Sequence, residues 1–590
     1  MSDPAVPDPA VPADASGPAV PADAVRFRLD GEDVEVDGGS GSLLEALRDG
    51  LGRRGVKDGC SPQGQCGCCT VLVDGAPRVS CVTPVRRVAG REVTTIDGLD
   101  EGVRGAWSAA FAAVGASQCG FCSPGIILRL VGAVVPGRAT DPGAGVRRAL
   151  SAHLCRCTGW QTIEEAAEVA TRATASRLIV DPMDGRDPTA AARRARLEGG
   201  TDQMVGPEVA LGRGGFADDS APPDALVAVP DGDGGYAVAS TLAAARSRAG
   251  KVQGRRSTEP LVHPVPVPDG SWDVTLQTTW VDPGYLEPDA SWCGPGGSPR
   301  SPLGNGGAFG GKLASPVARD ARELADRYGR PVRVLWSRED VVRMGPKRPP
   351  VGAGIRRDGT GVLAFGSPSP WPDRDMDAVR AAVRAVAPGL DVYLVPVVGP
   401  PVSAAIRAAV WAEAAVLAAV APWSATASPT PGATGPGPVT GATSPGPATA
   451  GASPVLGVPI TVVSPGGGRA TTTMRPDGGV VVEVSAGAVL DPVVLRSYVI
   501  GATHQALGWV LSEGIAVGPD GEVHDLTVRS LGVLPARETP PIEVRLDGDG
   551  AGPPVNASDA VFAATAAACW LATGLAPTWP GHALAAGGTR

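Results

Sequence analysis

The placement of cysteine constrains this chain more than any other feature of its sequence. Nine of the eleven cysteines lie between positions 60 and 157 of a 590-residue chain. Eleven are too few to scaffold a chain of this length with disulfides, and thiols gathered in one region are typical of metal sites. Apart from Cys68, the clustered thiols form two quartets: Cys60, Cys66, Cys69 and Cys81, then Cys119, Cys122, Cys155 and Cys157. The sequence therefore predicts two four-thiolate sites.

The first quartet lies in a segment with the element order of a β-grasp ferredoxin. Alternating apolar runs flank Asp30-Gly31 and Asp74-Gly75, turn sequences that favour positive φ and predict two hairpins. Between the hairpins, Ser42 can cap a helix that carries several leucines. The order is thus hairpin, helix, metal loop and hairpin.

The metal loop resembles that of a plant-type 2Fe-2S ferredoxin, with one difference. Plant-type proteins have four and then two residues between their first three ligands, whereas five residues separate Cys60 from Cys66 here. The extra residue lengthens the loop without removing a ligand. Glycines at 59, 64 and 67 allow a tight fold that aims backbone N–H groups at the sulfurs. Two alternatives stay open: Cys68 can substitute for a neighbouring ligand, and the four thiols can hold zinc.

The second quartet lies among predicted helices. One helix covers Trp107–Val114, and others are expected to begin after Ser123-Pro124, after Asp141-Pro142 and at Thr158. Thiols at helix N-termini are stabilised as thiolates by the helix dipole and by free N–H groups. The pair Cys155-Arg-Cys157 differs from a zinc ribbon, which normally uses two Cys-x-x-Cys pairs.

Two motifs in this region resemble the xanthine dehydrogenase/aldehyde oxidase family of molybdenum hydroxylases. They are Gln118-Cys-Gly-Phe-Cys-Ser-Pro-Gly125 and Cys155-Arg-Cys-Thr-Gly159, and the resemblance extends from about residue 26 to 175. It implies that the two quartets bind two 2Fe-2S clusters. It also implies that the second cluster lies next to molybdopterin, bordered by Gln118 and Cys157, and that the first lies nearer the electron acceptor.

Fragments of the later sequence resemble the molybdopterin-binding region of the same family. They include Tyr285-Leu-Glu-Pro288, Gly306-Gly-Ala-Phe-Gly-Gly-Lys312 and the segment 404–413. The resemblance implies cofactor contacts by four residues of these fragments: Gly307, Phe309, Gly310 and Arg407. The glycine-rich fragment also satisfies the P-loop pattern, but Leu313 stands where a P-loop needs Ser or Thr. A flexible turn and an ordinary amphipathic helix are the alternatives for the second and third fragments.

The catalytic carboxylate of that family has no clear counterpart. The family closes its active site with Gly-x-Gly-Glu, whose glutamate acts as general base. Here the corresponding stretch is Gly550-Ala-Gly552-Pro553, and proline accepts no proton. Asp559 lies six residues further on, so it needs a refolded loop to substitute. We assign no catalytic residue from the sequence.

Length and composition predict an α+β multidomain protein. At about 150 residues per domain the chain has room for four domains, and its 81 glycines and 59 prolines require linkers between them. We expect a disordered tail (1–24), a β-grasp 2Fe-2S domain (25–97), a helical 2Fe-2S domain (98–176), a linker (177–200), a hammerhead-like region (201–270), a two-part molybdopterin-binding-like region (271–422 and 457–590) and a low-complexity linker between its parts (423–456).

The charge pattern and the absence of recognisable membrane or secretion segments limit the expected partners and the expected location. A net charge of −9 without a long basic run argues against nucleic acid, and we identify neither a membrane span nor a secretory signal. We therefore expect a cytoplasmic protein, in an oligomer.

Two functions stay open. In the first, the chain is an oxidoreductase that passes electrons from a molybdopterin-linked hydroxylation site through both clusters to a flavin subunit or a soluble acceptor. In the second, it is an electron-transfer or scaffold subunit that serves a complete molybdenum subunit.

Overall fold

The computed structural model of the protein describes residues 24–39, 41–133, 142–176, 178–250, 259–300, 307–424, 453–548, 550 and 552–581. These residues form four sheets with helices packed on them, which confirms the α+β multidomain architecture. Almost all of the tail expected at 1–24 and most of the linker expected at 423–456 lie outside the described residues, as do Asp141, Gly306 and Ala551. No helix within the described ranges is long and apolar enough to cross a membrane.

The first sheet holds the two predicted hairpins. Its strand order is β2-β1-β5-β3-β4. Asp30 and Asp74 adopt positive φ in the two turns, as their sequences predict. Ser42 caps the first helical turn through Glu45 N, but the helix continues as a π-helix over Ala46–Gly50. The elements are β1 Ala24–Leu29, β2 Glu32–Asp37, α1 Leu43–Glu45, β3 Thr70–Val73, β4 Ala76–Val79 and β5 Glu92–Thr94.

Helices follow this sheet and surround the second thiol quartet. The predicted helices exist with shifted ends: the one expected at Trp107–Val114 begins six residues earlier, and the one expected at Thr158 begins at Gln161, because Trp160 has a positive φ of 71°. The segment expected as a linker contains helix α6. The helices are α2 Glu101–Ala113, α3 Ser123–Ala133, α4 Pro142–Ala149, α5 Gln161–Ser176, α6 Pro188–Gly199 and α7 Pro207–Ala210.

The second sheet, with the order β7-β6-β10-β9, is formed by segments on both sides of the glycine-rich fragment. Its elements are β6 Leu226–Pro230, β7 Tyr236–Ala239, α8 Leu242–Arg248, β9 Ala290–Cys293, α9 Val317–Tyr328, β10 Val332–Leu335 and α10 Arg338–Met344.

The third and fourth sheets make up the other half of the molecule. Their orders are β13-β12-β11-β8-β18 and β14-β15-β16-β17. The third sheet and its helices comprise β8 Val274–Thr278, β11 Val351–Ile355, β12 Gly361–Ser367, α11 Asp373–Val386, β13 Leu390–Pro396, α12 Trp411–Val420 and β18 Thr578–Trp579. The fourth comprises β14 Pro459–Val463, β15 Arg469–Met474, β16 Val480–Ser485, α13 Pro492–Leu511, β17 Ile542–Leu546 and α14 Ser558–Ala572.

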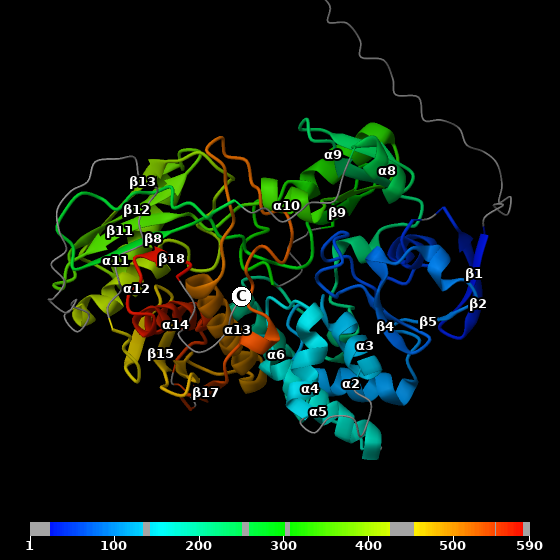
Figure 1. Cartoon of the computed structure of the whole chain (residues 1–590), viewed down its shortest axis with the longest axis horizontal. Helices are drawn as coiled ribbons and strands as arrows, with labels where there is room; N and C mark the ends of the chain where they lie inside the picture. Colours follow the sequence, from blue (N-terminus) through cyan, green and yellow to red (C-terminus); the bar gives the residue numbers. More distant parts are fainter. Residues whose placement is uncertain are drawn as a thin grey trace, which may run out of the picture.

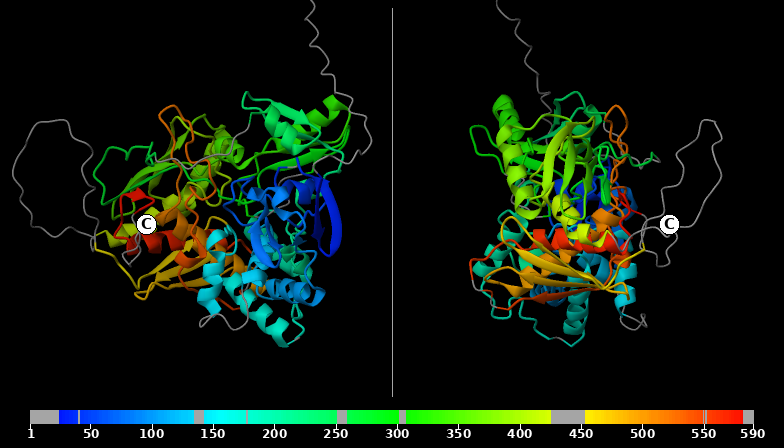
Figure 2. Two further views of the ribbon diagram at one scale, coloured as in Figure 1. Left: turned by 45° about the vertical axis from the view of Figure 1, so that its right-hand side comes forward. Right: turned by 90° about the vertical axis from the view of Figure 1, so that its left-hand side faces the viewer.

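The two halves of the molecule meet around α13. Figure 1 places the first sheet and helices α2–α5 on the right, the third and fourth sheets on the left, and α13 with α6 between them. Figure 2 shows the green third sheet above the yellow-to-orange fourth sheet, with the red α14 beside them. One apolar core joins both halves, since it contains Phe27 and Trp107 together with Tyr498, Ile515 and Val528. The N-terminal thiol region is therefore packed into the C-terminal part.

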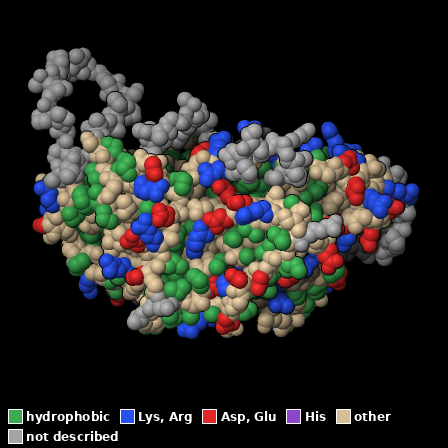
Figure 3. All heavy atoms as spheres, turned by 90° about the horizontal axis from the view of Figure 1, so that it is seen from below, with side chains coloured by type: hydrophobic (Ala, Val, Ile, Leu, Met, Phe, Trp, Pro, Cys, Tyr) green, Lys and Arg blue, Asp and Glu red, His purple; other side chains and the backbone are tan. Residues whose placement is uncertain are grey.

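The surface carries charges of both signs. In Figure 3, Lys and Arg side chains are intermingled with Asp and Glu side chains across the face seen from below. This mixture fits the modest net charge of −9.

Candidate functional site

The first thiol group is buried and its sulfurs accept backbone hydrogen bonds. Cys60, Cys66, Cys69 and Cys81 are each at most 5% exposed. Gln63 N donates to Cys60 Sγ at 3.2 Å, and Cys81 N lies 3.5 Å from Cys69 Sγ. The thiols contact one another in the order Cys66, Cys60, Cys81, Cys69. The loop thus aims N–H groups at sulfurs, as the glycines of the sequence predict.

Gly67 shows why this loop requires glycine. Its φ is +77°, and a Cβ atom there would lie 2.5 Å from the ring of His153. His153 in turn lies between the two thiol groups, with Nε2 3.3 Å from Thr70 Oγ1. Leu154 N donates to Cys66 O at 3.0 Å, so the two groups are held against each other by main-chain contacts.

The second group consists of two close sulfur pairs. Cys157 Sγ donates to Cys119 Sγ at 3.6 Å, and the thiols of Cys122 and Cys155 contact each other. The pKa of Cys155 falls to about 6, chiefly because the Cys122 thiol donates to its sulfur, with a further hydrogen bond from Thr158. Within the described residues, no three His, Cys, Asp or Glu side chains form a group suited to one metal ion. Paired thiols are the arrangement that a 2Fe-2S cluster uses, with two thiolates on each iron.

The structure brings Gln118 to the second thiol group. Its Nε2 donates to Cys157 O at 3.0 Å and to Ser497 Oγ at 3.1 Å. Its Oε1 is buried and has no hydrogen-bond partner among the described atoms. The cavity beside Gln118 has a volume of about 20 Å³, room for no more than one or two water molecules.

The glycine-rich fragment and the segment around Arg407 also meet at the second thiol group. A Cβ at Gly307 would lie 2.8 Å from Cys157 Sγ, so this loop rests directly on the thiol. Arg407 N donates to Phe309 O at 2.9 Å, and the guanidinium lies 4.0 Å from the centre of the Phe309 ring. A Cβ at Gly310 would lie 1.8 Å from Ala405 O. The predicted cofactor residues therefore lie together and pack on one another.

The space between these residues is small compared with a cavity for the molybdopterin that the family resemblance implies. The cavity lined by Phe309 and Arg407 has a volume of about 30 Å³, whereas ligand pockets have volumes of at least about 300 Å³. Arg156 and Glu513, which form an ion pair, both line it, and so does Arg348, which pairs with Glu413. Arg407 Nη1 donates to Gln505 Oε1 at 3.0 Å and Nη2 donates to Ser558 Oγ at 3.1 Å, so these donors bond groups of the chain itself.

Among the described residues, the carboxylates Glu513 and Asp559 near this site are each paired with an arginine. The loop at Pro553 packs closely on Gly487, since a Cβ atom at Gly487 would lie 2.1 Å from Pro553 O. Asp559 does lie near the predicted site, but its Oδ1 is 3.1 Å from Arg407 Nε, and Asp559 is not among the residues that line the cavity. Burial raises the pKa of Asp559 while Arg407 opposes that rise.

The contacts of Lys312 and the position of Arg407 bear on the P-loop and helix alternatives for these two fragments. Lys312 Nζ pairs with Glu287 Oε2 at 2.6 Å, and both side chains are buried. A P-loop lysine instead reaches toward phosphate. At the other fragment, α12 begins only at Trp411, so Arg407 lies in the turn before the helix.

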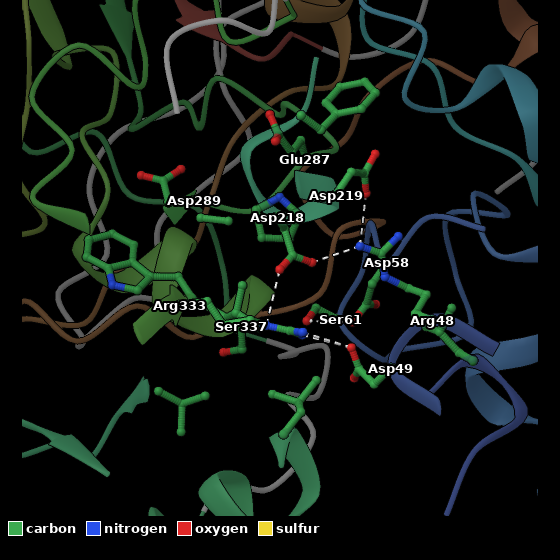
Figure 4. Close-up of a pocket in the computed structure, with 18 of the residues that line it drawn as sticks. Arg48, Asp49, Asp58, Ser61, Asp218, Asp219, Glu287, Asp289, Arg333 and Ser337 are labelled. Atoms are coloured by element: carbon green, nitrogen blue, oxygen red, sulfur yellow. Dashed lines mark hydrogen bonds and ion pairs between the residues drawn. The ribbon is translucent and has the colours of Figure 1, made fainter. Parts of the chain in front are cut away.

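A buried ionic junction fixes the first thiol group to the second sheet. Figure 4 shows Arg48 and Arg333 converging on Asp218, with Asp49 on the far side of Arg333. Arg48 Nη2 lies 2.7 Å from Asp218 Oδ2, and Arg333 Nη1 lies 2.9 Å from Asp49 Oδ1. Burial opposes the charge of Asp218, but Arg333 and Arg48 outweigh it and lower the pKa of its carboxyl. Because each charge has a partner, we interpret this network as a structural contact between the two parts of the chain.

Sequence reasoning missed the contacts that join the first loop to the C-terminal part. Gln63 Nε2 donates to Glu339 Oε1 at 2.7 Å and to Leu526 O at 2.8 Å, and Val528 N donates to Gln63 Oε1 at 3.0 Å. Arg529 Nε donates to Gln65 O at 3.0 Å. The only signal for them in the sequence is the lengthened Cys60–Cys66 loop, which supplies both glutamines.

His504 makes the stability of the chain pH-dependent. It is fully buried on α13, its Nε2 bonds Leu534 O at 2.9 Å, and its Nδ1 has no partner among the described atoms. Burial lowers its pKa from 6.5 to about 4. Between pH 4 and pH 6.5 the unfolded chain therefore binds more protons at this histidine than the folded chain. The contribution of His504 to the free energy of unfolding is present above pH 6.5 and is lost as the pH falls toward 4. From pH 7.5 to pH 5 this loss is about 2 kcal/mol.

We expect His504→Gln to remove this loss, since Gln can still donate to Leu534 O and does not titrate. Urea unfolding at the two pH values measures it: the wild type should lose about 2 kcal/mol more stability than the variant on acidification. Equal losses in the wild type and in His504→Gln would contradict the assignment.

The N-terminal part of the chain is similar to known 2Fe-2S proteins. Residues 27–89 match the model of the 2Fe-2S iron-sulfur cluster binding domain, and residues 95–168 match that of the 2Fe-2S binding domain. The nicotine 6-hydroxylase small subunit of Paenarthrobacter nicotinovorans is 37% identical over 142 residues, which are 23% of this chain and 85% of that one. The xanthine dehydrogenase iron-sulfur-binding subunit of Escherichia coli is 41% identical over 123 residues, 20% of this chain and 76% of that one.

The aldehyde oxidoreductase of Megalodesulfovibrio gigas is 40% identical over 132 residues, but these are 21% of this chain and 14% of that one. A solved structure of the aldehyde oxidoreductase from Desulfovibrio gigas superposes with a TM-score of 0.63 at 16% identity, covering 93% of this chain and 97% of that chain. Beyond residue 168, where the family models end, the likeness that these comparisons give is one of fold.

These matches confirm the two 2Fe-2S domains and an electron-transferring iron-sulfur oxidoreductase, and the molybdenum hydroxylase relatives are compatible with molybdopterin. The chain belongs to the xanthine dehydrogenase/aldehyde oxidase family.

Proposed function

We propose that the chain is the electron-transfer component of a molybdenum hydroxylase system, and that its C-terminal part is a scaffold without a molybdopterin of its own. Two 2Fe-2S clusters, each able to take up and release one electron, are bound by the two quartets. A separate molybdenum subunit supplies the electrons, and a flavin subunit or a soluble carrier accepts them. The observation that supports this most is the small volume, about 30 Å³, of the cavity beside Phe309 and Arg407, together with the packing of Gly307 on Cys157 Sγ.

The residues of this chain are suited to hold such clusters. The eight thiols are Cys60, Cys66, Cys69, Cys81, Cys119, Cys122, Cys155 and Cys157, and seven of them are buried. N–H donors such as Gln63 N at Cys60 stabilise the more negative, reduced state, and Thr158 Oγ1 lies 3.2 Å from Cys155 Sγ with the same effect. The backbone contacts through Leu154 and Cys66 keep the two clusters adjacent, as one-electron relay requires.

The relatives support a separate molybdenum subunit. Several of them are named as single subunits: nicotine 6-hydroxylase small subunit and caffeine dehydrogenase subunit gamma are two. The iron-sulfur region of our chain matches most of the length of these subunits, so it is complete as a relay. Its larger C-terminal part, in which the described carboxylates Glu513 and Asp559 are paired with arginines, then provides docking surface and support for the clusters.

A hydroxylase with its own molybdopterin is the second candidate. The buried Oε1 of Gln118 favours it, because this acceptor has no donor among the described atoms and a pterin N–H group would supply one. Opening of the Phe309–Arg407 contact would be needed to admit the cofactor.

Metal analysis separates the two candidates. We expect the chain, produced anaerobically in a host that makes molybdopterin, to contain about four irons, two for each cluster, and essentially no molybdenum. Alone it should oxidise neither aldehydes nor purines. One molybdenum per chain with turnover would establish the hydroxylase, and a chain without iron would contradict both candidates.

A further inference from the structure

The first thiol group contains one more cysteine than a 2Fe-2S cluster needs. Cys68 lies between the proposed ligands Cys66 and Cys69 in the chain and is 1% exposed. Its side chain contacts the thiol of Cys66, so five sulfurs rather than four are gathered here. The function proposed above assigns no role to the fifth.

The sulfurs of Cys66 and Cys68 both lie beside Gly59. A Cβ atom at Gly59 would lie 3.0 Å from Cys66 Sγ and 3.0 Å from Cys68 Sγ, so both sulfurs are close to the same point of the loop. Cys68 N also lies 3.5 Å from Cys66 Sγ. Either sulfur can therefore occupy a ligand position beside Gly59 after a small movement of the Cys66-Gly67-Cys68 segment.

The other proposed ligands are held in place more firmly. Cys69 leads directly into β3, and its carbonyl oxygen accepts Ser80 N at 3.2 Å and Ser80 Oγ at 2.8 Å. Cys81 follows β4 directly after Ser80, in the 3-10 helix Ser80–Val82. The Cys60 side of the loop is anchored by Gln63, which bonds Glu339, Leu526 and Val528 in the later part of the chain. Exchange is thus confined to the one segment that has two thiols.

We propose that Cys66 and Cys68 are interchangeable ligands of the first cluster, which has two ligand sets that share Cys60, Cys69 and Cys81. The inference rests on the proposed cluster at this site. In the exchange one iron–sulfur bond breaks and another forms, the proton of the incoming thiol passes to the outgoing thiolate, and the oxidation state of the iron is unchanged.

Alanine variants of the full chain test the exchange, because alanine supplies no ligand. We expect Cys66→Ala and Cys68→Ala each to retain about four irons and both reduced-cluster electron paramagnetic resonance signals. The double variant Cys66→Ala/Cys68→Ala should fall to about two irons and keep only the second signal. Cys60→Ala is the matched control and should also fall to about two irons, since it has no neighbouring thiol to replace it.

Retention of only about two irons by Cys66→Ala would overturn the proposal, and so would a double variant that keeps both clusters. If Cys66→Ala does not fold, the near-isosteric Cys66→Ser decides: an unchanged visible and resonance Raman spectrum means that Cys68 has become the ligand, whereas a shifted or lost spectrum means that it has not. A wild-type chain without iron refutes the proposed function itself, so the two failures are distinguishable.

Discussion

Replacing Cys122 with alanine removes the second 2Fe-2S cluster and lowers the iron content from about four to about two per chain. The thiol of Cys122 pairs with that of Cys155 at the start of α3, and both are buried. No cysteine beyond the quartet lies next to this pair in the sequence, in contrast to Cys66 and Cys68. Loss of one thiolate therefore leaves one iron with an incomplete ligand set.

The measurement combines iron and sulfide analysis with electron paramagnetic resonance of the dithionite-reduced protein. One of the two signals should vanish and the other persist, since the first cluster has its own ligands. Cys569→Ala is the matched control: Cys569 is also fully buried, but it lies within α14, and it should leave both signals unchanged. An unaltered spectrum in Cys122→Ala would mean that the second quartet is not a cluster site.

The iron-sulfur half of the fold could be predicted because its signals are local. Turns at Asp30 and Asp74 and a cap at Ser42 depend on a few adjacent residues, and all three occur as expected. Cysteine spacing is equally local. The ends of helices were predicted less well, since the start of α5 depends on the positive φ of Trp160, whose indole is buried and bonds Leu534 O far along the chain.

The candidate cofactor site shows the limit of such reasoning. Gln118 bonds the carbonyl oxygen of Cys157, and Phe309 packs on Arg407. Their motifs do not reveal that Arg407 bonds Gln505 and Asp559, or that Gly307 rests on Cys157. These partners are distant in sequence, so only the folded chain shows that they fill the space between the segments.

A second variant tests whether the C-terminal part supports the second cluster. Glu513 lies two residues after α13, is 1% exposed, and forms a bidentate ion pair with Arg156, the residue between Cys155 and Cys157. Burial raises the pKa of Glu513, and Arg156 counters that rise. We expect Glu513→Gln to leave the Arg156 charge buried without a counter-charge, which costs about 3 to 5 kcal/mol of unfolding free energy.

The same change should act on the cluster as well as on stability. Glu513 fixes a cation beside the proposed ligands Cys155 and Cys157, and its neutralisation leaves a net positive charge there that favours the reduced, more negative cluster. The reduction potential of the second cluster should rise, while the signal of the first stays constant. Urea unfolding and a redox titration measure the two effects. Glu543→Gln breaks only exposed pairs, with Arg545 and Arg475, and should alter neither quantity. A variant Glu513→Gln with wild-type stability and potential would show that the C-terminal part does not hold the cluster through this pair.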